Sequence, residues 1–318
     1  MKNHFFIIFF VLFSLLSCVS YKSLNKNIIV TTVCQTDAML GEGAVWDYKA
    51  EKLFWVDIEK GKLHIYDPNI EKDTTIDVGQ RIGTVVPESN NTVIVALQNG
   101  VYRLNLKDEG LDFLVNPEKG DKNNRLNDGK CDPAGRFWVG SMSLDNKPND
   151  AALYRINDEL MVEKIIDNVS VSNGICWSSL GNIMYYIDTP TRKIRKYAFD
   201  IKHGLVKYNG VAVEVDEKLG YPDGMTIDED GRLWVAMWDG GAVCCFNPED
   251  GKLIRKIDIP APRVTSCAFG GKNLEKLYIT TATVGLTKEQ LEEYPLSGSV
   301  FMIEPGVAGI PANYFGEY

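Results

Sequence analysis

The 318-residue sequence predicts an all-β protein: a six-bladed β-propeller of four-stranded antiparallel blades around a central channel. Two observations predict this fold. A short motif returns six times, and each return is followed by the same succession of β-type runs and turns. The repeated positions are separated by 40, 46, 45, 50 and 43 residues, counted from Gly43 through Gly83, Gly129, Gly174 and Gly224 to Cys267. A repeat of about 40 to 50 residues has the size of one propeller blade.

Each repeat opens with a small apolar strand beside its repeated position. A turn follows in several repeats, such as Asp-Pro-Ala-Gly-Arg at 132–136 and Asp-Glu-Asp-Gly-Arg at 228–232, and then an aromatic strand such as 137–140. A third strand ends on Asp or Asn, as at 63–68. Short β-rich runs separated by Gly, Asp, Asn and Pro are typical of antiparallel hairpins. A radial arrangement of such sheets leaves only short, protected edges.

Two further features complete the predicted ring. Helical periodicity competes with the β pattern only at 288–294. The two ends of the chain carry one unpaired β-type run each, and we expect 28–33 to pair with 299–304 within a single blade.

The first residues have the character of a secretory signal. Residues 1–4 are polar or basic and are followed by an apolar run over 5–16, which is shorter than the roughly 20 residues needed to span a membrane. The run ends in Leu-Leu-Ser-Cys at 15–18, which resembles a bacterial lipoprotein box with Cys18 as the lipidated residue. Ordinary cleavage or an uncleaved anchor are the alternatives. We therefore expect a lipoprotein-type signal at 1–17, a tether and first outer strand at 18–33, and the propeller at 34–318, attached by acyl chains to a bacterial cell envelope and facing the periplasm or the surface.

Composition excludes several classes of partner and site. The formal net charge of −9 becomes −10 without residues 1–17, and no run of Lys or Arg is present, so a nucleic-acid partner is not expected. No protein partner is implied. Six cysteines remain after Cys18, without a CxxC pair or metal-finger spacing, so a zinc-thiolate site is not expected. These cysteines are expected to be small buried residues. The sequence does not decide whether any two of them form a disulfide.

A shared position in the repeat places six side chains at one end of the channel. The innermost strand of each blade begins at one mouth, so the residue before each repeated position is aimed at a common axis. These residues are Glu42, Ile82, Asp128, Asn173, Asp223 and Ser266. Carboxylates that converge on one point repel one another unless something positive lies among them. A divalent cation is the simplest explanation.

The ligand types narrow the choice of ion. A preference for turns explains a single Asp or Asn before glycine. It does not explain Glu42, Asn173 and Asp223 together, because all three share one position in the repeat and Glu does not favour turns. Oxygen donors suit calcium, magnesium or manganese. His64 and His203 are the only histidines after the signal, and neither lies at a blade opening, so an imidazole-rich zinc site is not expected. Calcium is the first expectation for the cofactor, with zinc, manganese or magnesium as alternatives.

Several longer motifs resemble the gluconolactonase and regucalcin (senescence marker protein) family. They run in the family's order from about Cys34 to the C-terminus. The matching stretches are Leu-Gly-Glu-Gly-Ala-Val-Trp at 40–46, Arg-Leu-Asn-Asp-Gly-Lys at 125–130, Ser-Asn-Gly at 172–174, Tyr-Tyr-Ile-Asp at 185–188, Pro-Asp-Gly-Met at 222–225 and Thr-Ser-Cys-Ala-Phe-Gly-Gly at 265–271. The family implies a six-bladed propeller lactonase.

Carried over by residue, the resemblance implies metal ligands at Glu42, Asn173 and Asp223, with Asp223 also the catalytic base. It implies substrate contacts from Arg125 and Asn127. A further family carboxylate, usually Glu, falls on Asp145, which is one methylene shorter and leaves the identity of the sugar open. For Arg125, an ion pair with Asp121 or Asp128 is the alternative.

The expected function is therefore a metal-dependent hydrolase that opens a small-molecule sugar lactone, such as gluconolactone, by metal-activated water. No GxSxG motif is present, and the few histidines leave little for a Ser-His-Asp triad. Two alternatives stay open. One is a non-catalytic calcium- or glycan-binding propeller presented at the membrane surface. The other is an organophosphate or aromatic-lactone hydrolase of the same family.

Overall fold

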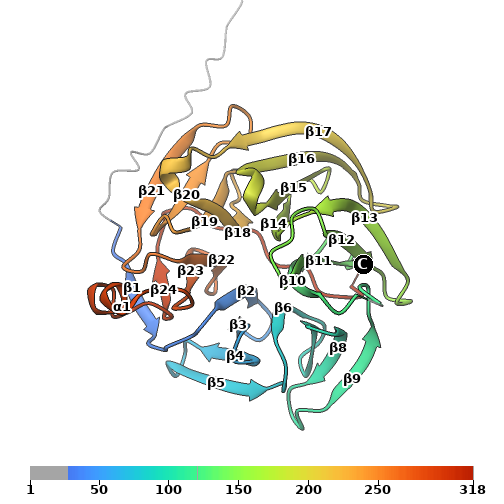
Figure 1. Ribbon diagram of the computed structural model, residues 1–318, viewed down its shortest axis with the longest axis horizontal. Helices are drawn as coiled ribbons and strands as arrows, with labels where there is room; N and C mark the ends of the chain where they lie inside the picture. The colour runs from blue at the N-terminus through green and yellow to red at the C-terminus, as the bar shows by residue number, and fades with distance from the viewer. Residues whose placement is uncertain (1–27, 120, 318) are drawn as a thin grey trace, which may run out of the picture.

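Six four-stranded antiparallel sheets are arranged radially in the computed structural model, which describes residues 28–119 and 121–317 (Figure 1). Blade 1 contains β2 (Gly41–Asp47), β3 (Lys52–Asp57), β4 (Lys62–Asp67) and β5 (Lys72–Asp77). Blade 2 contains β6 (Ile82–Pro87), β7 (Thr92–Leu97), β8 (Gly100–Asn105) and β9 (Leu111–Val115). Blade 3 contains β10 (Asn124–Cys131), β11 (Phe137–Ser143), β12 (Ala151–Ile156) and β13 (Val162–Val169).

The remaining blades repeat the order. Blade 4 contains β14 (Ser172–Trp177), β15 (Ile183–Asp188), β16 (Lys193–Asp200) and β17 (Leu205–Glu214). Blade 5 contains β18 (Tyr221–Ile227), β19 (Leu233–Trp238), β20 (Ala242–Phe246) and β21 (Leu253–Asp258). Blade 6 contains β22 (Val264–Gly270), β23 (Lys276–Thr281), β24 (Val300–Ile303) and β1 (Thr31–Cys34). The described helices are the short η1 (Thr189–Thr191), η2 (Glu217–Leu219) and α1 (Lys288–Glu293), so the predicted fold class is confirmed.

The ring closes by pairing the two ends of the chain in blade 6. Strand β1 lies antiparallel to β24, with Thr31 opposite Met302 and Cys34 opposite Val300. The predicted pairing of 28–33 with 299–304 is thereby confirmed. Closure of this kind completes the last sheet and removes the free edge that β24 would otherwise present.

Every innermost strand is irregular at the same place. The register between the innermost strand and its neighbour shifts once in each blade, beside the repeated position; in blade 1 the shift falls between Glu42 and Val45, and in blade 5 between Pro222 and Met225. A β-bulge bends a strand and re-aims a side chain. At Gly43 the backbone is left-handed, with φ of 59°, a conformation that glycine adopts readily. The repeated glycine motif is thus the signature of a bulge next to the channel.

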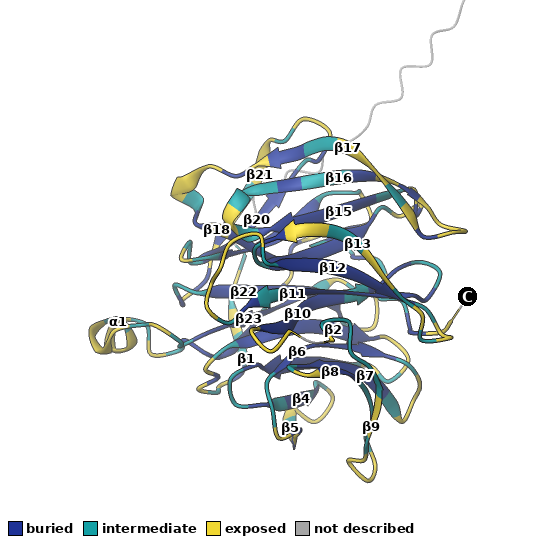
Figure 2. Cartoon of the chain, turned by 45° about the vertical axis from the view of Figure 1, so that its right-hand side comes forward, coloured by how far each residue is buried: buried dark blue, intermediate teal, exposed yellow. Residues whose placement is uncertain are grey.

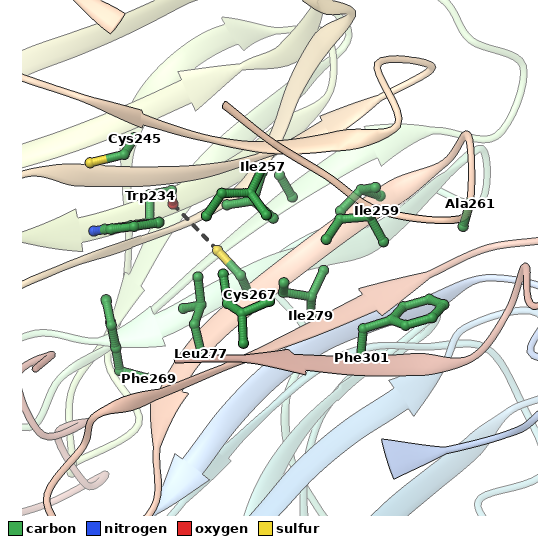
Figure 3. Packing of buried hydrophobic residues seen from close by; sticks show 14 of the residues in the cluster. Trp234, Cys245, Ile257, Ile259, Ala261, Cys267, Phe269, Leu277, Ile279 and Phe301 are labelled. Carbon is green, nitrogen blue, oxygen red and sulfur yellow. Dashed lines mark hydrogen bonds between the residues drawn. The ribbon is translucent and has the colours of Figure 1, made fainter. Parts of the chain in front are cut away.

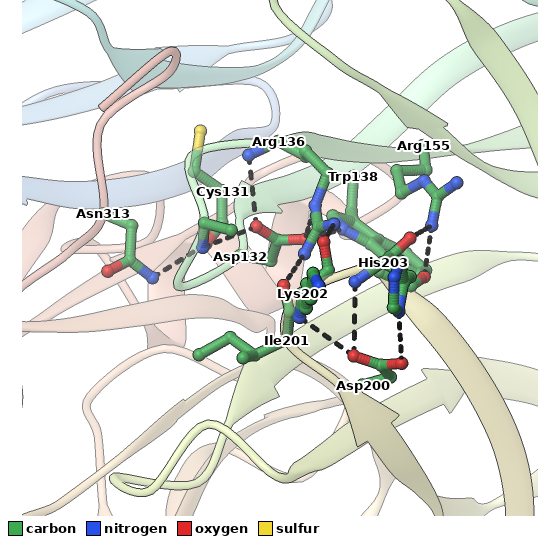
Figure 4. A network of polar contacts seen from close by, with 12 residues as sticks. Cys131, Asp132, Arg136, Trp138, Arg155, Asp200, Ile201, Lys202, His203 and Asn313 are labelled. Carbon is green, nitrogen blue, oxygen red and sulfur yellow. Dashed lines mark hydrogen bonds and ion pairs between the residues drawn. The ribbon is translucent and has the colours of Figure 1, made fainter. Parts of the chain in front are cut away.

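The recurring Asp-x-x-Gly-Arg turn links the first and second strands through its aspartate. In blade 3, Asp132 Oδ2 accepts hydrogen bonds from Arg136 Nε (2.7 Å) and from the indole of Trp138 (2.8 Å), as Figure 4 shows. In blade 5, Asp228 accepts from the indole of Trp234 at 2.9 Å. A buried carboxylate needs such partners to offset its lost hydration. The motif therefore fixes the turn and the tryptophan of the following strand together.

The core lies between neighbouring blades. The inner strands are buried and the outermost strands are partly exposed (Figure 2). Between blades 5 and 6, Trp234 packs against Phe269, and the Cys267 thiol donates a hydrogen bond to the Trp234 carbonyl at 3.3 Å (Figure 3). The six cysteines within the described residues are all buried and free, and burial raises the pKa of the Cys176 thiol to about 12. They are core residues, as predicted.

A C-terminal segment, residues 307–317, crosses the ring and contacts five blades (Figure 1). Its backbone hydrogen bonds reach Leu274, Glu229, Pro87 and Gly135, in blades 6, 5, 2 and 3 or their connecting turns. The buried hydroxyl of Tyr314 donates to the Asp47 carboxylate at the end of β2 in blade 1. The segment, called the strap below, closes the channel mouth toward which the innermost strands run.

The predicted signal at 1–17, the lipidated Cys18 and most of the tether lie outside the described residues. Within the described ranges, no helix has the length and apolar character required to cross a membrane.

Candidate metal and substrate site

The predicted ligands come together at the channel mouth where the innermost strands begin. Glu42 is the second residue of β2, Asn173 the second of β14 and Asp223 the third of β18. Each is buried, with 5%, 5% and 6% of its surface exposed. Their side chains lie beside the bulges described above. Three separate blades therefore deliver one carboxylate, one carboxamide and one further carboxylate to a single buried place.

The buried site disfavours the charged form of its carboxyl groups. Burial, followed by the charge of Asp128, raises the pKa of Glu42 to about 8. Burial and the neighbouring Glu42 and Asp128 raise the pKa of Asp223 well above its usual range, with the carboxyl group of Glu42 close to that of Asp223. Burial likewise raises the pKa of Asp128. Without a cation, the cluster retains protons in order to reduce like-charge repulsion.

Two carboxylate oxygens in the cluster have no partner. The buried Oδ1 of Asp223 and the buried Oδ2 of Asp128 form no hydrogen bond, whereas Glu42 and Asp128 each accept from the following backbone N–H at 2.7 Å. Buried polar atoms without partners are rare, and a bound ion is one explanation. The donors are all oxygens, which suits a hard divalent cation. Glu42, Asn173 and Asp223 therefore fit the predicted metal site, with Asp128 beside it.

The predicted metal site combines one carboxamide with two carboxylates. Among residues 28–119 and 121–317, no group of three or more His, Cys, Asp and Glu side chains is placed to hold a metal ion by itself. The histidines lie elsewhere, since His64 bonds Asp73 on the outer part of blade 1 and His203 bonds Asp200.

A chain of hydrogen bonds joins the predicted substrate residues to the ligands. Arg125 Nη1 donates to Asn127 Oδ1 at 2.6 Å, and Asn127 Nδ2 donates to Asn173 Oδ1 at 3.0 Å. Asn173 Nδ2 then donates to Thr189 Oγ1 at 2.8 Å, and that hydroxyl donates to the carbonyl of Pro222 at 2.9 Å. The chain passes from β10 through β14 and η1 to β18. It fixes Asn173 and ends one residue before Asp223.

Arg125 is a buried cation beside the acidic cluster, with 5% of its surface exposed. Burial lowers its pKa to about 10, against the opposing influence of Glu59 and Glu42, so the guanidinium stays charged at neutral pH. Its hydrogen bonds to Asn127 and to the Leu126 carbonyl both leave from Nη1. No ion pair with Asp121 or Asp128 involves this side chain within the described residues. The donors on Nε and Nη2 are therefore the ones left for a ligand.

Asp145 is placed apart from the cluster. It lies in the turn after β11 and its side chain is exposed. Its backbone N–H donates to Ser143 Oγ at 3.3 Å. In the described structure no hydrogen bond or ion pair joins its carboxylate to Arg125 or Asn127. The proposed substrate contact from Asp145 stays a prediction.

Thr189 is a positioning residue that sequence reasoning missed. It directly follows the Tyr-Tyr-Ile-Asp strand, and its hydroxyl is the only described link between Asn173 and β18 in the chain above. Thr189→Val keeps the shape and removes both hydrogen bonds, so we expect divalent-cation affinity to fall about tenfold, in line with the usual cost of losing a group that orients a ligand. Thr189→Ser is the matched control and should retain affinity. Isothermal titration with calcium measures both variants, and equal affinity for Thr189→Val would remove this role.

The chain is similar to known proteins over most of its length. The model of the SMP-30/Gluconolactonase/LRE-like region matches residues 40–283. A Bacillus subtilis (strain 168) protein named "Putative sugar lactone lactonase YvrE" is 39% identical, covering 89% of this chain and 97% of its own. Regucalcin of Xenopus laevis is 34% identical, covering 91% and 99%.

A solved structure also superimposes over most of the chain. The crystal structure of a calcium-binding protein, regucalcin, from Agrobacterium tumefaciens has a TM-score of 0.86 and 25% identity, and the match covers 91% of this chain and 97% of that one. The resemblance in the motifs is therefore confirmed, and the protein belongs to the SMP-30/gluconolactonase/LRE-like family.

Proposed function

We propose that this protein is a metal-dependent lactonase that hydrolyses a sugar lactone. One observation carries the proposal: Glu42, Asn173 and Asp223 meet at one channel mouth, and Arg125 is hydrogen-bonded into the same network through Asn127. A site that only stores a cation has no need of a buried guanidinium beside it. A hydrolase does, because negative charge develops on the substrate's carbonyl oxygen during attack by water.

The donor set of Glu42, Asn173 and Asp223 would hold one divalent cation, calcium first. When bound, such an ion supplies Lewis acidity to the lactone carbonyl and increases the acidity of a neighbouring water molecule. The carboxylate of Asp223 accepts the proton of the attacking water. The unused Nε and Nη2 donors of Arg125 bind the carbonyl oxygen as it gains charge. The water oxygen forms a bond to the carbonyl carbon, the ring C–O bond breaks, and the ring oxygen takes up the proton that Asp223 accepted from the water. The carboxylic acid so formed then ionises and releases one proton to solvent.

The name of the Bacillus subtilis relative supports the sugar lactone class. The buried polar lining of the site supports a hydroxyl-rich substrate, because an apolar one would leave Arg125 and the carboxylates without partners. The test is proton release from a panel of aldonolactones, aromatic lactones and organophosphates. Turnover confined to aldonolactones is expected. Turnover confined to another class would reassign the substrate, and no turnover with tight calcium binding would favour the binding-protein alternative.

The shifted pKa values predict how pH acts on the metal-free protein. The native state keeps protons on Glu42 that the unfolded chain, with the ordinary pKa of 4.5, releases. Stability therefore falls as pH rises from about 4.5 through about 8, by about 2 to 5 kcal/mol. Glu42→Gln should flatten this dependence. Urea unfolding in chelator at pH 5.5, 7 and 8.5 measures it, and a flat wild-type profile would contradict the proposed charge crowding.

Attachment to a bacterial envelope through Cys18 is a further part of the proposal, and it is supported by the sequence of residues 1–18. Cys18→Ser is expected to abolish incorporation of labelled palmitate and to move the protein out of the membrane fraction. Ser17→Ala keeps a small residue before the cysteine and should leave labelling intact. Equal labelling of wild type and Cys18→Ser would refute the lipoprotein assignment.

A further inference from the structure

A cavity lies at the mouth opposite the acidic site. Its volume is about 480 Å³, and its walls include Trp46, Lys130, Trp177 and Phe269, which are the later residues of four innermost strands. Trp46 follows Glu42 by four residues on β2, a separation of roughly 13 Å along a strand. The cavity is therefore distinct from the candidate metal and substrate site.

The strap forms the other side of this cavity. Ile310, Pro311, Ala312, Asn313 and Tyr314 all line it. Asn313 Nδ2 donates to the carbonyl of Cys131 at 3.1 Å, visible in Figure 4, and Phe315 N–H donates to the carbonyl of Pro87 at 2.9 Å. Both walls are thus fixed by hydrogen bonds. A preformed concave space of roughly 300 to 1,000 Å³ with mostly apolar walls is the usual form of a small-molecule site.

Lys130 supplies one positive charge to this space. It projects from β10, is partly buried, and its ammonium donates to the carbonyl of Met225 on β18. An ammonium has three donors, so two are left. Within the described residues, no carboxylate lies within ion-pair distance of Lys130, and the acid that lines the cavity, Glu317, is paired with Lys49. Asp128, two residues earlier on the same strand, belongs to the acidic cluster, and the charge of Lys130 partly opposes the rise of its pKa that burial causes.

We propose that this cavity is a second ligand site, which takes a small organic anion with a flat, apolar body. The anionic group bonds the free donors of Lys130, and the body packs on Trp46 and Phe269. A sugar acid matches this description poorly, because the aromatic part of the wall at Trp46 and Phe269 offers its hydroxyl groups no partners. The ligand is therefore chemically different from the substrate and product of the proposed lactonase reaction, and the site stands whether or not that activity is found.

Two fluorescent probes that differ by one charge test the site. 1-Anilinonaphthalene-8-sulfonate is anionic, and N-phenyl-1-naphthylamine is its uncharged parent. We expect the sulfonate to bind the purified folded protein, Lys130→Met to weaken it about tenfold, and the uncharged probe to change less than twofold. Lys130→Arg keeps the charge and should restore sulfonate binding. Equal sulfonate affinity in wild type and Lys130→Met, or an equal loss of both probes, would overturn the proposal.

A variant that fills the cavity with a larger side chain shows where the probe binds. It tests the proposal even if Lys130→Met does not fold. Thr226 lines the cavity from β18, so Thr226→Phe should abolish binding of both probes while cooperative thermal unfolding is retained. Gluconolactone and calcium at saturating concentrations should not displace the sulfonate. Retained binding in Thr226→Phe, or displacement by the lactone, would place the probe elsewhere and refute the second site.

Discussion

Replacing Asp223 with alanine is expected to lower kcat/KM for lactone hydrolysis on the order of 10³-fold, in the range measured for loss of a general base. The same change should weaken divalent-cation binding, because Asp223 combines both roles. Its Oδ1 is buried without a partner, and its carboxyl group lies against that of Glu42. Removing the side chain takes away the proton acceptor and one of the two carboxylates expected to hold the ion.

Ser266→Ala is the matched control for this variant. Ser266 occupies the corresponding position on β22 and is equally buried, with 2% of its surface exposed, but it carries no charge. We expect it to keep activity and cation affinity within about threefold of wild type. Initial rates with and without added calcium, together with calcium titration calorimetry, measure both variants. Activity in Asp223→Ala close to that of Ser266→Ala would remove Asp223 from the mechanism.

The second large effect is expected from Arg125. Arg125→Met keeps much of the side-chain volume and removes the charge, so it should lower kcat/KM roughly 10²-fold, the lower end of the cost of losing one oxyanion donor. Divalent-cation affinity should not decrease, because the lost group is a cation beside the proposed metal site. The Arg125 hydrogen bond to Asn127 also disappears, so part of the loss is expected to arise from a less fixed Asn127.

Arg81→Met provides the comparison for Arg125. Arg81 is a nearby guanidinium that influences the pKa of Arg125, but it is held by Glu59 at 2.9 Å and is partly exposed. Its loss should change kcat/KM by less than about fivefold. Arg125→Lys restores charge without the planar fork and is expected to recover activity only in part. Steady-state kinetics measure kcat/KM for all three variants. A kcat/KM of Arg125→Met equal to that of Arg81→Met would exclude the proposed role of Arg125 in binding the carbonyl oxygen.

The sequence predicts the fold well because the same local sequence motifs recur in successive blades. The glycine beside the bulge in blades 1 to 5 and the aspartate that bonds Trp138 or Trp234 are local features, so they recur along the chain and are visible without a structure. The closure by β1 and β24 also follows, since two unpaired strands at the chain ends have one blade left to complete. Glu42, Asn173 and Asp223 share the register of these motifs, which is why they could be selected together.

Contacts between distant segments that lie outside the repeated pattern were not predicted. Thr189 acts through Asn173 and Pro222, and nothing in its own neighbourhood signals that partnership. The strap crosses the ring by hydrogen bonds at or near the turns between the first and second strands of separate blades, and its own sequence has no β alternation or periodicity. The second cavity exists only where that segment meets the later residues of the innermost strands. A signal for Thr189 was available in principle, because it directly follows a strand that carries a family motif.

The most direct test of the account is metal-restored hydrolysis. Purified protein is depleted with chelator, proton release from gluconolactone is followed at constant pH, and calcium, manganese, magnesium or zinc is then added back. We predict loss of activity on depletion, recovery with one equivalent of bound cation per chain, and no recovery in Asp223→Ala. Full activity in the metal-free protein, or recovery in Asp223→Ala equal to that of wild type, would contradict the proposal that Glu42, Asn173 and Asp223 form the catalytic metal site.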